Sequence, residues 1–282
     1  MTQSPDQFDD EFLMQFIAEL HSRSGYDFRH YSLTSIRRRI SRILQVQKFS
    51  DLSELKTWVY SCSDAEHEFI ESLSVPTTSM FRDPEVFKII RTAVLPMLKH
   101  LPLLRVWSAG CSTGEEAYAL AIMLDEEGLY DRSRIYVTDI NEGFIGRARA
   151  GIFPMRLMKE YTTNYMESGG CHDFSSYFET GYDRIVFNGR LKSNMVFAHH
   201  NLVSDSSFNE FGLILCRNVL IYFGTPLQGR VLNLLDDSLR VDGYLILGEK
   251  ESLRMSTIGG GYEQLQRPYK VFRKTAPGLS QT

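Results

Sequence analysis

The residues best suited to chemistry form a small-residue turn at positions 109–114, with the sequence AGCSTG. None of these side chains is large, so a ligand can approach the backbone closely. A strand-forming run with Val106 and Trp107 precedes the turn, and Glu115 and Glu116 begin a run of strong helix formers after it. Because a parallel α/β sheet binds its cofactor at such a turn, the sequence predicts a cofactor site here that includes Gly110.

The chemistry of the turn narrows the class of ligand. A phosphate-binding loop ends in Gly-Lys-Ser/Thr, whereas Gly114 is followed by two glutamates, which would repel a polyphosphate. A dinucleotide fingerprint needs three glycines, and only Gly110 and Gly114 are present. An acidic residue directly after the turn suits a ligand with a positive end and free hydroxyls, such as S-adenosylmethionine. On this stretch alone, such a site and an ordinary glycine turn fit equally well.

Polar residues also follow two other predicted strands. Asp139 ends the strand at 134–138, where nucleotide-binding folds hold ribose hydroxyls; a helix N-cap is the other role open to it. Arg217 and Asn218 lie between the apolar strand at 211–216 and a second apolar run. Solvation alone does not explain two polar residues in that position, which favours a place on the rim of the cofactor site over a surface turn.

The elements that must position these residues divide the chain into a helical part and an α/β part. Capping residues and helical periodicity predict helices that begin near Ser4 and cover 32–47, 51–60 and 64–73. This indicates an all-helical domain at 1–75 and a linker with the start of a helix at 76–90. That helix begins after Asp83 and continues to about residue 99, with a kink at Pro96.

The remaining residues, 91–282, have the pattern of a Rossmann-like α/β domain. Short apolar runs predict strands at 103–107, 134–138, 195–199, 211–216 and 244–248, closed by an antiparallel hairpin at 262–274. Residues 152–194 are rich in Tyr, Ser, Gly and Phe, and we interpret them as a small inserted β subdomain with antiparallel strands within 175–190. The predicted class is therefore an α/β sheet with an N-terminal helical domain and an inserted β subdomain.

The second helix combines an apolar stripe with a basic surface. Arg37, Arg38, Arg39 and Arg42 are predicted to project away from the buried stripe. Two interpretations stay open: a solvated basic face, and a docking face for an acidic partner, because complementary charge steers encounter.

Composition sets limits on compartment and partners. The chain has 282 residues, with 43% hydrophobic and 23% charged residues and a net charge of −4, which argues against nucleic acid as its main partner. The four cysteines lie far apart and predict reduced thiols in a cytoplasmic protein. His199 and His200 have no matching ligands nearby, so no metal is expected. The acidic N-terminus does not fit a signal peptide, and no apolar run predicts membrane insertion.

Taken together, several motifs resemble the CheR family of chemotaxis receptor methyltransferases. They occur in the family's order and cover most of the chain from about residue 30 to 273: TTSMFRDP (77–84), RVWSAGCSTGEEAYALA (105–121), YVTDIN (136–141), ARAGIF (148–153), HNL (200–202), LCRNVLIYF (215–223) and DGYLILGEKESL (242–253). The resemblance implies a class I methyltransferase domain that carries an inserted β subdomain. It also implies methyl transfer from S-adenosylmethionine to glutamate side chains in the cytoplasmic helical domain of a chemoreceptor or a related signalling protein.

The resemblance also assigns roles to single positions. The cofactor would be lined by Glu116, Asp139, Asn201, Leu202, Arg217 and Asn218, with Asp139 at the ribose and Asn201 and Leu202 at the adenine. Thr78 and Arg82 would contact its methionine end, Arg82 and Tyr222 would lie nearest the transferred methyl, and the arginines from Arg37 to Arg42 would face the receptor.

The sequence departs from the family pattern at a few positions. Pro76 stands where Asn is frequent, Met80 where Phe is common, and Ala117 where Pro is common. No short glycine-flanked insertion is present, so recognition of a C-terminal receptor tether is not expected. We expect a monomer. The alternatives are a class I methyltransferase that acts on a small molecule or RNA, and a non-catalytic module that binds S-adenosylmethionine.

Overall fold

The computed structural model describes residues 9–24, 26, 28–29, 31–73, 78–253 and 256–276. It forms two compact units, Met1–Val75 with Ile221–Gln228, and Pro76–Leu220 with Gly229–Thr282. The predicted helix start at Ser4 lies outside the described residues, as do Pro76 and Thr77 of the TTSMFRDP motif.

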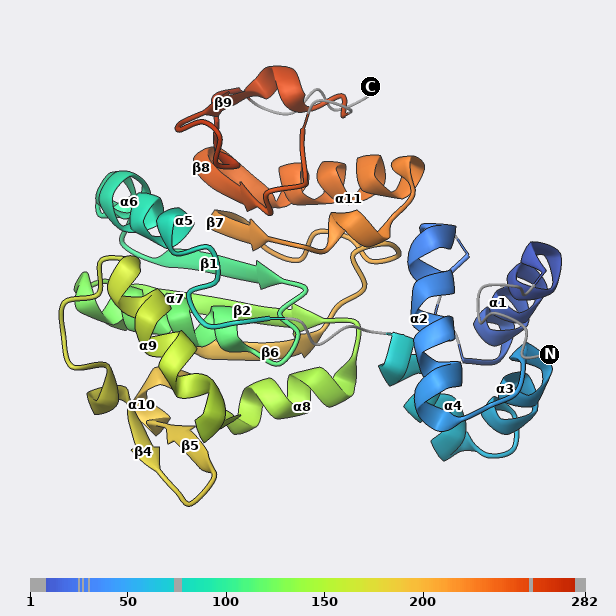
Figure 1. The fold of residues 1–282 in the computed structure, drawn as a ribbon. Helices are drawn as coiled ribbons and strands as arrows, with labels where there is room; N and C mark the ends of the chain where they lie inside the picture. Colours follow the sequence, from blue (N-terminus) through green and yellow to red (C-terminus); the bar gives the residue numbers. More distant parts are fainter. Residues whose placement is uncertain are drawn as a thin grey trace. The chain divides into compact units, whose positions relative to one another are not determined.

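The first unit is helical, as predicted, with α1 (Asp10–Ser24), α2 (Leu33–Gln47), α3 (Leu52–Val59) and α4 (Ser63–Leu73) (Figure 1). Its core is built from helical stripes that include Phe16, Ile40 and Phe69, each fully buried. Asp51 caps α3 by accepting a hydrogen bond from the Glu54 amide at 2.9 Å. The segment 221–228 joins this unit through a β-bridge between Tyr31 and Phe223.

The second unit is organised by a seven-stranded sheet in the order β6-β2-β1-β7-β8-β10-β9. The strands are β1 (Leu104–Ala109), β2 (Ser133–Asp139), β6 (Met195–His199), β7 (Phe211–Cys216), β8 (Leu239–Leu247), β9 (Tyr262–Gln264) and β10 (Val271–Lys274). The first five strands of that order pair in parallel, whereas β10 pairs antiparallel with β8 and with β9. This confirms the predicted sheet and its closing hairpin.

The strand order identifies the edge of the sheet where a ligand binds. β1 pairs with β2 on one side and with β7 on the other, so the chain changes direction across the sheet at β1. Every residue of β7 is buried, as expected for a parallel strand covered on both faces. Doubly wound sheets bind ligands outside the carboxyl ends of the strands at such a switch point.

The helices of this unit are α5 (Pro84–Ile89), α6 (Leu95–Leu98), α7 (Glu115–Glu126), α8 (Glu142–Ala150), α9 (Met158–Glu167) and α10 (Gly189–Lys192), while α11 (Thr225–Ser238) spans both units. None of the helices in the described ranges is long and apolar enough to cross a membrane. The helix predicted at 84–99 consists of α5, a π-helical stretch, Ile90–Val94, and α6 in direct succession, and the irregular turn lies just before Pro96, where a kink was expected. Pro96 has no amide hydrogen and would clash with a carbonyl one turn earlier, so the wider turn before it relieves the clash.

The inserted segment contains the predicted antiparallel strands and a helix that the sequence analysis missed. β3 (Ile152–Pro154), β5 (Arg184–Phe187) and β4 (Phe178–Thr180) form a three-stranded sheet in that order. The missed helix is α9, which buries Met158, Tyr161 and Tyr165. These positions have helical spacing, but tyrosine and threonine are weak helix formers, which hid the pattern.

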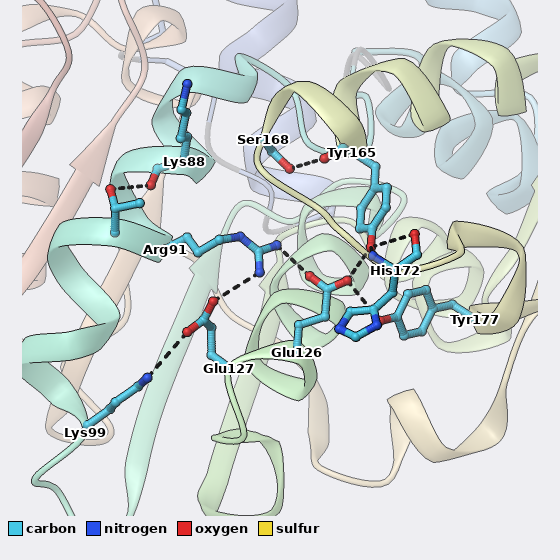
Figure 2. A network of polar contacts seen from close by, with 10 residues as sticks. Lys88, Arg91, Lys99, Glu126, Glu127, Tyr165, Ser168, His172 and Tyr177 are labelled. Carbon is cyan, nitrogen blue, oxygen red and sulfur yellow. Dashed lines mark hydrogen bonds and ion pairs between the residues drawn. The ribbon is translucent and has the colours of Figure 1, made fainter.

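A polar network holds the inserted segment to the last turn of α7 (Figure 2). Arg91, in the π-helical stretch, pairs with Glu126 at 2.6 Å and with Glu127 at 3.2 Å. The Tyr165 and Tyr177 hydroxyls donate to the same Glu126 oxygen, Tyr177 at 3.0 Å. Burial and the neighbouring Glu126 raise the pKa of both phenols, so they remain donors. The network supports the far end of the helix whose first turn carries Glu115 and Glu116.

Candidate methyl-donor site at the carboxyl edge of the sheet

The turn after β1 is shaped by packing within the protein. The amides of Gly110 and Cys111 both donate to the Thr138 carbonyl at 2.9 Å, which fixes the turn against the end of β2. A Cβ on Gly110, whose φ is +75°, would lie 2.5 Å from a Val219 methyl carbon. A Cβ on Gly114, whose φ is +99°, would lie 2.7 Å from the Ala148 Cβ. Both glycines are therefore required by close neighbours in the chain itself, a reason that the sequence analysis did not supply.

Asp139 lies at the end of β2 and joins two of the loops that follow strands. Its carboxylate oxygens accept hydrogen bonds from the Ser112 and Asn141 amides, each at 2.9 Å. Burial raises the pKa of Asp139, and the backbone donors oppose that rise. Each carboxylate oxygen can accept a second hydrogen bond, so Asp139 keeps acceptor capacity for a hydroxyl. The helix N-cap role belongs to Asn141, whose side-chain oxygen accepts from the Phe144 amide at 3.1 Å.

Arg217 is the charged centre behind the turn. Its side chain is only 3% exposed and pairs with Asp83 at 2.6 Å and with Glu116 at 3.3 Å. It also donates to the Arg82 carbonyl at 2.9 Å. The second Glu116 oxygen accepts from the Ser108 hydroxyl at 2.9 Å. The structure therefore brings together three predicted site residues, Arg82, Glu116 and Arg217, by contacts within the protein.

The loop that carries Arg82 has an uncommon backbone conformation. Phe81 and Asp83 both have positive φ, at 51° and 57°, which costs free energy for residues other than glycine. Phe81 is fully buried, with its ring 5.2 Å from that of Phe87 and 5.4 Å from that of Tyr165. The packed ring and Arg217 hold the strained loop, and Arg82 lies half-buried between its two strained neighbours. Thr78, also half-buried, begins the described part of the same loop.

Glu251 is a supporting residue that the sequence analysis missed. Its carboxylate accepts four backbone amides: Gly248 at 2.6 Å, Asn218 at 3.1 Å, Val219 at 2.8 Å and Leu220 at 2.7 Å. It is 4% exposed, and burial raises its pKa against the effect of these donors. The contacts tie the loop after β7, in which Asn218 has a positive φ of 60°, to the end of β8. An acid just after a buried strand is the only sequence signal for this role.

The loop after β6 places Asn201 and Leu202. The Asn201 side-chain oxygen accepts from the Val203 amide at 2.9 Å, and its own amide donates to Asp205 at 2.8 Å. Leu202 is buried. His200 packs against Trp107, with ring centroids 5.3 Å apart, and burial lowers the pKa of its imidazole.

Unpartnered polar atoms mark this edge as a place for a polar ligand. Among the described residues, eight buried side-chain atoms have no hydrogen-bond partner, and four of them lie in the loops after β1, β2, β6 and β7: Ser112 Oγ, Asn141 Nδ2, His200 Nδ1 and Arg217 Nε. Buried polar atoms are nearly always satisfied in folded proteins. Their occurrence in four loops at one edge fits a ligand with several donors and acceptors, as S-adenosylmethionine has. No cluster of three potential metal ligands occurs in the described part of the chain.

The remaining predicted residues lie in the first unit, where Arg39 differs from the expectation. Arg38 and Arg42 are exposed, and Arg37 pairs with Asp10. Arg39 is only 7% exposed and therefore does not belong to the basic surface. Its neighbour Ile40 continues the apolar stripe, so the side of α2 that faces the core includes this arginine. Tyr222 belongs to the same unit and lies under the Arg39 guanidinium.

The sheet order and the site at its carboxyl edge define the class I methyltransferases. The family description "CheR methyltransferase, SAM binding domain" matches residues 76–266, and "CheR methyltransferase, all-alpha domain" matches 12–74. The chain belongs to the CheR methyltransferase family. It is an S-adenosylmethionine-dependent protein-glutamate methyltransferase.

Relatives of this chain include proteins named as methyltransferases. Cher3 of Pseudomonas putida is 42% identical over 92% of this chain and 95% of its own length. A chemotaxis protein methyltransferase of Borreliella burgdorferi is 29% identical over 86% of this chain and 88% of its own. A 104.1 kDa protein of Rhodobacter capsulatus is 31% identical over 94% of this chain, which spans 28% of that longer protein.

Proposed function

We propose that this methyltransferase acts on glutamates in the cytoplasmic helical domain of a chemoreceptor or a related signalling protein, and that the carboxyl edge of the sheet holds the donor. The unpartnered polar atoms in four adjoining loops carry the second part of the proposal. The exposed Arg38 and Arg42 on α2 would attract an acidic receptor surface.

Different residues of the second unit would contact different parts of the donor. Asp139 would accept hydrogen bonds from the ribose hydroxyls, and Asn201 and Leu202 would border the adenine. Glu116, Gly110, Arg217 and Asn218 would form the inner wall, while Thr78 and Arg82 would meet the methionine end. Asp139 supports this division most directly, because it retains acceptor capacity while two amides fix its orientation.

The chemistry asks for orientation more than for proton transfer. A glutamate carboxylate has a reference pKa near 4.3 and is already ionised at neutral pH, so no general base is needed. The donor supplies an electrophilic methyl carbon on a positively charged sulfur. The chain must hold the carboxylate oxygen in line with that carbon and exclude water, and such alignment can supply about 7–11 kcal/mol.

Arg82 suits this task, and Cys111 does not interfere with it. Arg82 can donate charge-assisted hydrogen bonds to a carboxylate, and its backbone is fixed by Arg217 at 2.9 Å. Cys111 is buried within the turn, and burial together with Asp139 raises the pKa of its thiol. The thiol therefore stays protonated and does not compete with the substrate as a nucleophile.

Replacement of Arg82 tests the proposal. Arg82→Ala is expected to retain donor affinity within about threefold by calorimetry, and to lose turnover on a receptor fragment by at least about 100-fold, as for a charged group used in the transition state. Arg230→Ala, at an exposed position of α11, is the matched control. Labelled donor should leave a base-labile label on the fragment. An unchanged rate would exclude a role for Arg82, and the absence of label with native protein would exclude the receptor substrate.

A further inference from the structure

One arginine of α2 has contacts unlike those expected of a docking residue. Arg39 is 7% exposed, and its Nη1 donates to the carbonyl of Leu73 at the end of α4. Its guanidinium carbon lies 4.1 Å from the centroid of the Tyr222 ring. A desolvated cation above an aromatic face is a strong form of this interaction. The guanidinium of Arg39 is thus held by two contacts, one with the last carbonyl of α4 and one with the ring of Tyr222.

The backbone around Tyr222 is attached to the same unit by independent contacts. The Ser32 amide, directly before α2, donates to the Tyr222 carbonyl at 2.8 Å. The Tyr31 ring meets that of Phe223 edge-on, with centroids 5.0 Å apart, and the two residues form a β-bridge. The helical unit therefore holds both the main chain and the ring of Tyr222.

We propose that Arg39 is a positioning residue for Tyr222, fixing the orientation of the ring that the family resemblance places beside the transferred methyl. The inference rests on the proposed function, with Tyr222 beside the transferred methyl as the family resemblance implies. It gives α2 two tasks on two faces: the exposed Arg38 and Arg42 meet the substrate, and the buried Arg39 holds a residue of the reaction.

The guanidinium is suited to this task because it stays charged when buried. Burial lowers the pKa of Arg39, and the charge and hydrogen bond of Tyr222 oppose that shift. The planar group can stack on the ring while its Nη1 donates to Leu73, which a lysine ammonium cannot reproduce. The ring therefore has one preferred orientation before any substrate arrives.

Steady-state kinetics separate positioning from docking. In the full chain, Arg39→Met is expected to lower kcat for a receptor fragment by at least about 10-fold and to leave KM within about twofold. The matched change on the exposed face, Arg38→Met, is expected to raise KM with little change in kcat. Arg39→Lys keeps the charge without the planar group and should recover only part of kcat. A raised KM with unchanged kcat for Arg39→Met would make Arg39 a docking residue and overturn the inference.

A second variant separates positioning from a structural role. In a Tyr222→Ala background, Arg39→Met should cause no further loss of kcat, because the residue it positions is absent. Equal losses in both backgrounds would assign Arg39 to the cap of α4 alone. Thermal unfolding identifies variants that fail to fold, in which case Arg39→Lys provides the same comparison.

Hydrogen exchange tests the inference without activity. Arg39→Met should speed exchange of the Ser32 amide, the donor to Tyr222, by at least about 10-fold, with donor affinity unchanged. Unchanged exchange there would overturn the inference even if the native protein proved to modify a different substrate. Absence of methyl transfer by the native protein, with faster exchange in the variant, would instead reject only the proposed substrate.

Discussion

The two ends of α7 carry glutamates, and the helix dipole acts on them in opposite directions. The helix begins with Glu115 and Glu116 and ends at Glu126, with Glu127 directly after it. A helix N-terminus favours negative charge, whereas a C-terminus disfavours it. The C-terminal pair is accordingly neutralised by Arg91 at 2.6 and 3.2 Å and by Lys99 at 3.4 Å.

The polar groups around Glu126 differ from those around Glu116. Glu126 also accepts hydrogen bonds from two tyrosines, so both of its carboxylate oxygens have partners within the protein (Figure 2). Buried side-chain atoms without a partner occur near both ends in the described part of the chain: Arg91 Nε at the C-terminal end, and Ser112 Oγ and Arg217 Nε in the loops around Glu116. Both ends are paired with an arginine, Glu116 with Arg217 and Glu126 with Arg91, but only the N-terminal pair adjoins the loops that follow the parallel strands. We therefore expect changes at the C-terminal end to act on stability and changes at the N-terminal end to act on donor binding.

Arg91→Met should have the largest effect and should act on stability alone. It leaves Glu126, whose side chain is 1% exposed, without its cation, and loss of one partner of a buried pair costs about 3–5 kcal/mol. Denaturant unfolding measures the loss. The control is Lys99→Met at a half-exposed site, where about 0–1 kcal/mol is expected. A weakened donor affinity in folded Arg91→Met protein would break the separation between the two ends.

Asp139→Asn should act mainly on donor binding, whereas Arg91→Met acts on stability. An amide cannot replace all the acceptor sites of the carboxylate, so donor binding should weaken by about 1.5–3 kcal/mol, or about 10- to 150-fold. Calorimetry with S-adenosylhomocysteine measures the change, and Asp131→Asn at an exposed position serves as the control. Unaltered affinity would remove Asp139 from the site.

His200→Gln tests how the stability of the loops near the N-terminal end of α7 depends on pH. Burial lowers the pKa of His200 below its ordinary 6.5, so the unfolded chain binds the proton more readily. Its contribution to stability is complete above about pH 6.5 and is lost as pH falls toward the lower native pKa, with a slope of at most about 1.4 kcal/mol per pH unit. The difference between the unfolding free energies at pH 7.5 and pH 5.5 should be smaller in the variant than in the native protein. An equal decline in both proteins would assign the acid sensitivity to other groups.

Tyr177→Phe should have the smallest effect. It removes one of two phenol donors to Glu126, the one at 3.0 Å, while Arg91 remains. The expected loss is about 1 kcal/mol of unfolding free energy with unchanged donor affinity. Tyr182→Phe, fully exposed in the same inserted segment, is the control and should be neutral.

The sequence predicted the parallel strands and the turn after β1 because buried parallel strands form continuous apolar runs, as in β7. It also indicated which loops carry polar residues, since Asp139 and Arg217 directly follow such runs. Roles that depend on tertiary contacts could not be predicted in this way. Glu251 finds four amides only after β7 and β8 pair, and Arg39 is recognised as buried only once Tyr222, far along the chain, lies beneath it.

The stretch from Asn218 to Phe223 has its first amides bound by Glu251 and its last residues bonded beside α2. The two family descriptions meet near residue 75. The compact units, however, also divide the chain between Leu220 and Ile221, within this stretch. A shortened protein that starts at residue 76 would lack Arg39, Ser32 and Tyr31, whose contacts hold Tyr222 and Phe223. Exchange of the helical unit between relatives must accordingly move residues 221–228 along with it.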